Sequence, residues 1–286
     1  MAKYIKSCWV PDFWNTAPYF NPVRLFASEL KPYSNWPTLS EYQQLLQGGG
    51  TALTNSQGQL LKIVAQGPHT TIFAEKYAPR IYLTGEIQTR TENWHDLFQV
   101  LTWRLFPRTK AVINQRQYHA ALQQQSVTGN VQRSKVENML SLFDECGAVL
   151  LYSDENLGTF VREFEWQQLF WEQRTALEEQ FSCVIFGHAL YEKMFNPYIG
   201  VTANSILIPC KKRYFDLPLQ EQMQFIDREL SRCLRNHDLY QQPGNLAPFP
   251  LLGLPGWYPE NEAASFYDNS SYFRPRNRPS TKRKSL

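Results

Sequence analysis

Pro107 divides the most strongly patterned stretch of the chain, residues 93–119, into two expected helices. Before the proline, apolar side chains recur at the spacing of one helix face: Leu97, Val100, Leu101 and Leu105. Proline disfavours the helical conformation of the residue before it, so the first helix is expected to end at Phe106. A second helix is expected from about Thr109, so the pattern predicts two helices that meet at a sharp corner.

The composition predicts a globular protein with an aromatic core. The 286 residues are 43% hydrophobic and 14% aromatic, and aromatic rings contribute large buried areas. We expect a single domain over residues 1–275. The five cysteines include no CxxC pair, which excludes a zinc ribbon and suits a reducing cytoplasm. Because no signal peptide or membrane-spanning run is found, a cytoplasmic location is expected.

The charge is distributed unevenly along the chain. The net charge is +3, yet residues 274–286 carry six basic side chains and no acidic one. The preceding residues therefore carry about −3 by the same count, which argues against nucleic-acid binding by the body of the protein. Residues 276–286 are expected to form a disordered basic tail, and this tail could contact nucleic acid or another polyanion.

The order of the expected elements predicts an α+β fold: a small, mostly antiparallel sheet with packed helices, and extended aromatic arms at the N- and C-termini. Residues 60–65 and 70–75 are expected to form short strands or exposed segments, and strands are expected at residues 80–84, 183–186 and 205–209. Parallel pairing around Val184 and Ile206 stays open. A β-hairpin is expected from residues 139–152, with the acidic sequence Asp144–Gly147 at its turn. Long amphipathic helices are expected at residues 164–181 and 217–239.

Four ionisable residues form the leading candidate site. His95 and Asp96 lie in the first turn of the helix before Pro107, and His188 and Glu192 are four residues apart on another expected helix. Imidazole and carboxylate groups on one face can bind a divalent metal or act as an acid–base pair. We expect His95 or Asp96 to lie within about 6 Å of His188 or Glu192. The alternative is that Asp96 stabilises its helix N-terminus and that the histidines are hydrogen-bonded core residues.

Two further groups of side chains have less specific patterns. Asp144 and Glu145 could bind metal or act as acid and base, but acidic residues are also common in turns, which is the favoured interpretation. Lys110, Asn114 and Lys193 are candidates for anion binding, and a solvated helix face explains Lys110 and Asn114, together with Arg116, equally well. The chain has no GxGxxG, GxxxxGK[ST] or GxSxG motif, so neither nucleotide binding nor an α/β-hydrolase nucleophile is indicated.

Six segments of the chain resemble a bacterial family known only as domain-of-unknown-function family 3025. They are NWHDLFQVLTWRLFPRTKAVIN (93–114), SLFDECGAVLLYSD (141–154), LFWEQR (169–174), VIFGHALYEKMFNPYIGVTA (184–203), LGLPGWYPENE (252–262) and FYDNSSYFRP (266–275). The resemblance covers most of the chain from about residue 80 onward. It implies a single-domain protein but no activity, substrate or cofactor, so it assigns no role to any residue.

Two classes of function remain. The first is a hydrolase- or transferase-like enzyme that uses His95, Asp96, His188 and Glu192, with or without a metal; if a metal is bound, its ligands are expected among His188, Glu192 and His95. The second is a non-catalytic binding or scaffold protein whose basic tail contacts a polyanion. Clustering of the four side chains in one pocket favours the enzyme, and scattering favours the scaffold. The sequence identifies neither a cofactor nor a partner.

Overall fold

The computed structural model describes residues 8–48, 50, 52–128 and 133–276. The fold is α+β, as expected. The helices are α2 (Asn21–Ala27), α3 (Leu39–Gln47), α4 (Tyr77–Thr84), α5 (Trp94–Leu105), α6 (Pro107–Thr128), α7 (Lys135–Cys146), α8 (Glu155–Glu163), α9 (Arg174–Gln180), α10 (His188–Lys193) and α11 (Leu219–Arg235). The strands are β1 (Lys62–Ala65), β2 (Glu86–Thr89), β3 (Gly147–Tyr152), β4 (Phe181–Ile185), β5 (Thr202–Pro209) and β6 (Ala247–Pro250).

The central sheet has the strand order β4-β3-β5-β6. Its inner strand β3 is buried along its whole length and pairs antiparallel with β4 and parallel with β5, so that Val149 lies opposite both Val184 and Ile206. The parallel pairing that the sequence left open therefore occurs at Ile206. The β5–β6 pair is antiparallel, and β1 and β2 form a separate parallel pair.

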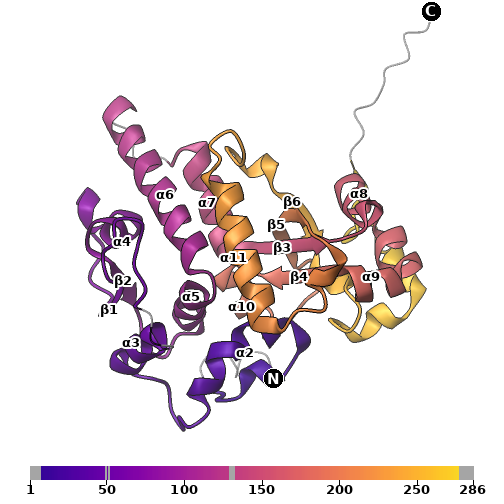
Figure 1. The fold of residues 1–286 in the computed structure, drawn as a ribbon, viewed down its shortest axis with the longest axis horizontal. Coiled ribbons are helices and arrows are strands. Elements are labelled where there is room, and N and C mark those ends of the chain that lie inside the picture. Colours follow the sequence, from indigo (N-terminus) through magenta and orange to yellow (C-terminus); the bar gives the residue numbers. More distant parts are fainter. Residues whose placement is uncertain (1–7, 49, 51, 129–132, 277–286) are drawn as a thin grey trace, which may run out of the picture.

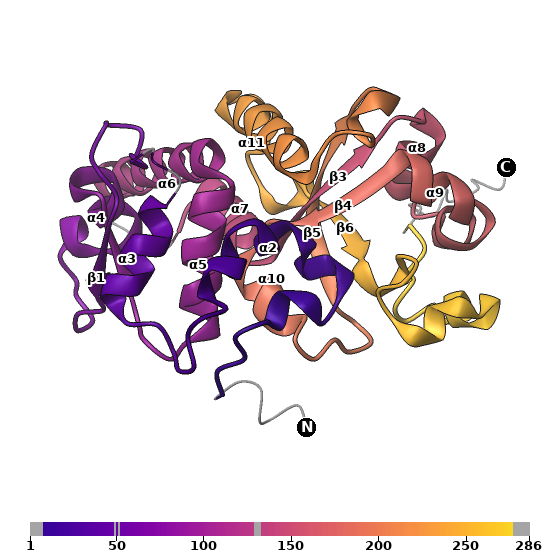
Figure 2. The ribbon, with the colours of Figure 1, turned by 60° about the horizontal axis from the view of Figure 1, so that its bottom comes forward.

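The helices are arranged on two sides of α7 and α10. Figures 1 and 2 show α3, α4, α5 and α6 with β1 and β2 on one side, and the central sheet with α8, α9 and the C-terminal segment on the other. Helix α10 contacts both α5 and α7, and α6 contacts α7 and α11. The candidate residues on α5, α7 and α10 thus lie where these two parts meet. Among the described residues, no helix is both long and apolar enough to cross a membrane.

The corner at Pro107 forms as the sequence predicts. Helix α5 ends at Leu105, Phe106 has non-helical backbone angles (φ −129°, ψ 55°), and Pro107 is the first residue of α6. The first amide groups of α6 have no partner within the helix. Asp227 of α11 satisfies two of them, because its carboxylate accepts hydrogen bonds from the main-chain N–H groups of Arg108 (3.1 Å) and Thr109 (2.8 Å).

The strand expected at residues 80–84 is wrong, because these residues belong to helix α4. The β-branched and aromatic side chains of this segment favour a strand, but tertiary contacts override that preference. Helix α4 packs against α6, and the side-chain amide of Asn55 donates hydrogen bonds to the carbonyl groups of Ile81 (2.7 Å) and Tyr82 (2.9 Å) near the helix end. Gly85 then ends the helix with a left-handed conformation (φ 75°).

The β-hairpin expected at residues 139–152 is also wrong. Residues 139–143 lie in helix α7, and only the second half of the segment is a strand, β3. The helix begins at a capping box formed by Ser134 and Glu137. The short apolar run that suggested a strand contributes Met139, Leu140 and Phe143 to the buried face of this helix. A run of five residues is too short to distinguish the period of a helix from the period of a strand. As a result, Glu145 lies in the last turn of a helix and not in a hairpin turn.

The long helix expected at residues 164–181 is interrupted. Helix α8 ends at Phe164, which has a left-handed conformation (φ 61°), and a short π-helical turn, Gln168–Glu172, precedes α9. The helix expected at residues 217–239 is present as α11.

Both aromatic arms pack on the body, as expected. Trp9 stacks on Trp94 of α5 at 5.3 Å between ring centroids. The hydroxyl of Tyr272 donates a hydrogen bond to the carbonyl of Val201 (2.7 Å), so the C-terminal arm is fixed beside β5. Of the expected basic tail, the structure describes only Arg276, whose guanidinium pairs with a surface carboxylate. Residues 277–286 lie outside the described residues.

We propose that the body is one folding unit, because buried apolar residues from Phe13 to Phe273 form one contiguous core. Limited proteolysis should therefore give either a nearly intact body or small peptides, since opening any part of a shared core exposes the rest. The outcome is read by mass spectrometry over the time course. Two stable halves separated by a cut near residue 125 would contradict this proposal.

Candidate metal centre

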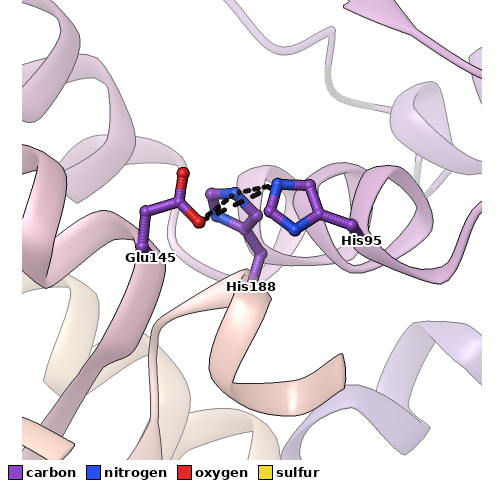
Figure 3. Close-up of side chains that lie close together, drawn as sticks. All are labelled: His95, Glu145 and His188. Carbon is purple, nitrogen blue, oxygen red and sulfur yellow. Dashed lines mark hydrogen bonds and ion pairs between the residues drawn. The ribbon is translucent and has the colours of Figure 1, made fainter. Parts of the chain in front are cut away.

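Three helices bring one side chain each to a common point (Figure 3). His95 lies in the first turn of α5, Glu145 in the last turn of α7, and His188 is the first residue of α10. The Nε2 atoms of His95 and His188 are 3.0 Å apart. The expected proximity of these two histidines, which are 93 positions apart in the sequence, is confirmed.

The local backbone explains why these helix ends meet. Asn93 caps α5, because its side-chain oxygen accepts a hydrogen bond from the N–H group of Asp96 (3.1 Å). Gly187 precedes α10 and presses against the end of α7. A Cβ atom at position 187 would lie 2.4 Å from the carbonyl oxygen of Glu145, so only glycine allows this approach. The main-chain N–H groups of Phe186 and Gly187 both donate to the Gly147 carbonyl at 2.9 Å, which holds the start of α10 against β3.

The three side chains have the spacing of metal ligands. The Oε2 atom of Glu145 lies 3.5 Å from Nε2 of His188 and 3.8 Å from Nε2 of His95. With the 3.0 Å between the two nitrogens, these distances form a triangle whose circumradius is about 2.0 Å, and a zinc–imidazole bond is about 2.0–2.1 Å. One ion can therefore contact all three atoms without a rearrangement of the backbone. Two imidazoles and one carboxylate are a ligand set of catalytic zinc sites and of non-haem iron sites.

A carboxylate lies near the second nitrogen of each imidazole. Nδ1 of His95 is 3.4 Å from the carboxylate of Glu192, and Nδ1 of His188 is 4.0 Å from the carboxylate of Asp144. Asp144 is itself held by the ammonium group of Lys110 at 2.6 Å, and both of these side chains are buried. A carboxylate hydrogen-bonded to Nδ1 keeps the proton there and directs the lone pair of Nε2 toward a metal. Glu192 is close enough to His95 for this role, whereas the 4.0 Å between Asp144 and His188 is longer than a hydrogen bond.

The pKa values of the three groups follow from burial and from these charges. Burial, which is opposed by Asp144 and aided by the charges of Lys110 and His95, lowers the pKa of His188 to about 3, so this imidazole is neutral at physiological pH. The hydrogen bond to Glu192 raises the pKa of His95 above its ordinary value, despite partial burial. Burial also raises the pKa of Glu145, although the neighbouring His95 opposes that rise. A neutral imidazole such as His188 is ready to bind a metal, whereas the raised pKa of His95 makes protonation compete with metal binding there.

The site is closed on one side and open on the other. The His188 side chain is 3% exposed, the His95 side chain 28% and the Glu145 side chain 46%. A metal held by these atoms would have protein on the His188 side and solvent on the Glu145 side. That leaves a coordination position for water or a substrate, which is the arrangement of catalytic rather than structural metal sites.

Asp96 is not part of this cluster. Its carboxylate accepts a hydrogen bond from the main-chain N–H of Arg90 (2.6 Å) and pairs with the guanidinium of the same residue (2.8 Å). Glu192 belongs to the site through its contact with His95. A catalytic role for Asp96 stays a prediction that its pairing with Arg90 does not support.

The candidate anion-binding residues do not form one group. Lys110 is buried against Asp144, and the side-chain amide of Asn114 donates to the carbonyl of Ala78 (2.8 Å). The alternative interpretation, a solvated helix face, is wrong for these two residues and for Arg116, because all three are buried. Lys193 is exposed, and its ammonium group contacts the sulfur of Cys146 at 3.2 Å. Cys146 directly follows the candidate ligand Glu145 in the sequence. Anion binding by Lys110, Asn114 and Lys193 stays a prediction.

Glu145 is the candidate ligand that the leading site expected from the sequence did not include. It was considered, but its expected place in a hairpin turn separated it from the histidines. A signal was present, since His95, Glu145 and His188 each lie in one of the segments that carry the family resemblance: residues 93–114, 141–154 and 184–203.

Comparison with known proteins gives one match. The sequence model of a family described as a protein of unknown function (DUF3025) matches residues 61–277 and so includes all three candidate ligands. No curated protein and no solved structure matches the chain.

Proposed function

Because the chain belongs to the DUF3025 family, whose function is unknown, we propose a function from the geometry of the site itself. His95, Glu145 and His188 bind one zinc ion, and the protein is a zinc-dependent hydrolase. The observation that carries this proposal is the convergence of two Nε2 atoms and one carboxylate oxygen at zinc-binding distances, with a carboxylate near each Nδ1 atom.

A purely structural histidine pair explains the site less well. Nδ1 of His188 is buried and has no hydrogen-bond partner of normal geometry among the described residues. A buried polar atom without a partner costs about 1–3 kcal/mol, so proteins rarely retain one without a role. Zinc on Nε2 would keep the proton on Nδ1, which faces the carboxylate of Asp144 at 4.0 Å.

The proposed chemistry uses the exposed side of the site. Zinc lowers the pKa of a bound water to about 7, which supplies hydroxide at neutral pH. Held by His95, Glu145 and His188, zinc would in this way supply the nucleophile for hydrolysis of a carbonyl or phosphoryl compound. Glu145, the most exposed ligand, marks the side from which the substrate enters.

The clustering of side chains supports the enzyme over the scaffold. His95, His188 and Glu192 lie together and only Asp96 lies apart, and clustering was the pattern expected of an enzyme. A basic tail that contacts a polyanion falls on residues outside the described part of the chain and stays a prediction.

The proposal predicts one tightly bound zinc ion per chain. Protein purified without a metal-affinity tag should contain about one equivalent of zinc by elemental analysis. Chelation should remove the metal together with any hydrolysis of ester, phosphodiester or amide probes, and added zinc should restore both. If Fe(II) but not zinc restored the activity, the proposed zinc would have to be replaced by iron. The proposed hydrolysis would then also be replaced, because iron uses the same ligand set in oxygenases. A chain that binds neither metal would contradict the proposal.

A further inference from the structure

A polar groove of about 340 Å³ lies between α4, α6 and α7. Lys76 and Tyr77 line it from the start of α4, Gln117 and Gln125 from α6, and Arg133 and Ser141 from the α7 side. Glutamine amides both donate and accept hydrogen bonds, so they suit a chain with amide or hydroxyl groups better than an apolar molecule.

The groove leads to the metal ligands along two helices. Ser141 is four residues before Glu145 on α7, so the two side chains share a face and lie about 6 Å apart along the helix axis. The hydroxyl of Tyr77 forms a hydrogen bond with the side chain of Gln99, which is four residues after His95 on α5. On α7 the groove is therefore one helical turn from a candidate ligand, and Tyr77 connects it to a residue of α5 that lies one turn from His95.

Among the residues that the structure describes, two cations of the groove have no carboxylate partner. Lys76 and Arg133 are exposed, and within the described ranges no Asp or Glu oxygen lies in ion-pair contact with either. The one carboxylate that lines the groove, Glu137, is engaged by the main-chain N–H of Ser134 at 2.8 Å. Lys76 and Arg133 against Glu137 leave the lining of the groove with a formal net charge of +1, which can attract an anion.

We propose that this groove binds the substrate of the zinc site and that the substrate is a polar chain with an anionic group, a carboxylate or a phosphate, held by Lys76 and Arg133. The proposal rests on the proposed hydrolase function. The cations hold the anionic end, the glutamine amides hold the chain, and the scissile bond lies at the exposed side of Glu145, about one helical turn away.

The test uses three trialanine probes with the same fluorescent N-terminal label. One ends in a carboxylate, one in a phosphonate that stands in for a phosphate, and one in a neutral amide. Binding is measured by fluorescence anisotropy on the full-length, metal-free protein, so that no probe can gain affinity by binding zinc. The wild type should bind at least one anionic probe about tenfold more tightly than the amide. The tighter of the two anionic probes identifies the natural group.

The double variant Lys76→Gln/Arg133→Gln should lose this preference. The matched control Arg24→Gln/Lys135→Gln removes the same charges from exposed positions outside the groove and should keep it. Because all four side chains are exposed, both double variants should fold and bind zinc as the wild type does. Equal binding of charged and neutral probes by the wild type, or a preference that survives Lys76→Gln/Arg133→Gln, would overturn the groove assignment. Failure of zinc binding would overturn the hydrolase proposal instead, since the probes report on the groove without the metal.

Discussion

His188→Ala, His95→Ala and Glu145→Gln should each weaken zinc binding by at least about 100-fold, because loss of a partner that merely orients a ligand already costs about 10–100-fold. Each variant removes one of three protein ligands and leaves two, which hold zinc poorly. The measurement is a competition titration against a fluorescent zinc chelator. His237→Ala is the matched control, because His237 is exposed and lies outside the cluster, and it should bind zinc as the wild type does.

The same titration carries a pH signature. Glu192 raises the pKa of His95, and a protonated imidazole cannot bind zinc. Zinc affinity should therefore rise with pH as His95 loses its proton, and the rise should be centred above the ordinary imidazole pKa of about 6.5. In Glu192→Gln the pKa of His95 falls, so the rise should shift to lower pH.

Stability measurements separate a ligand from a core residue. If His188 is a metal ligand, His188→Ala should lose zinc while the metal-free protein unfolds at nearly the same denaturant concentration as metal-free wild type. A variant that is strongly destabilised but still binds zinc would show that His188 is a core histidine. Glu145→Gln is the cleaner case, because its half-exposed side chain contributes little to packing.

Lys110→Met should destabilise the protein by about 3–5 kcal/mol, since it leaves the buried carboxylate of Asp144 without its partner. The Lys110–Asp144 pair is 2.6 Å long, with side chains 2% and 8% exposed. Equilibrium unfolding in urea gives the free energy. Lys212→Met makes the same change in an exposed pair with Glu179, and it should alter the free energy of unfolding by no more than about 0.5 kcal/mol.

A double variant identifies the cause of this loss. Lys110→Met/Asp144→Asn removes both charges, so it should be less destabilised than the sum of the two single variants by about 1–3 kcal/mol. Additive losses would show that packing of the lysine stem, and not the ion pair, stabilises this region. Because Asp144 also faces Nδ1 of His188, the single variant Asp144→Asn should weaken zinc binding as well.

Features encoded by neighbouring residues could be predicted from the sequence. The Pro107 corner depends on the proline itself, and the proximity of His95 and His188 followed from two polar helix starts that needed a common environment. The strand expected at residues 80–84 was wrong because α4 depends on Asn55 and on packing against α6, which no local pattern reveals. The place of Glu145 in the site was missed for a related reason. A short apolar run before it fits a strand as well as a helix, and that choice moved the carboxylate into a turn.

The three candidate ligands come from three helices, α5, α7 and α10, so a bound ion would also cross-link these helices. His95 belongs to the part of the chain before the α6–α7 connection, whereas Glu145 and His188 follow it. No fragment cut in that connection holds the complete ligand set, and an unfolded chain must close two long loops to assemble it. A bound ion would therefore tie the two sides of the molecule together, much as a disulfide does, while remaining removable by a chelator.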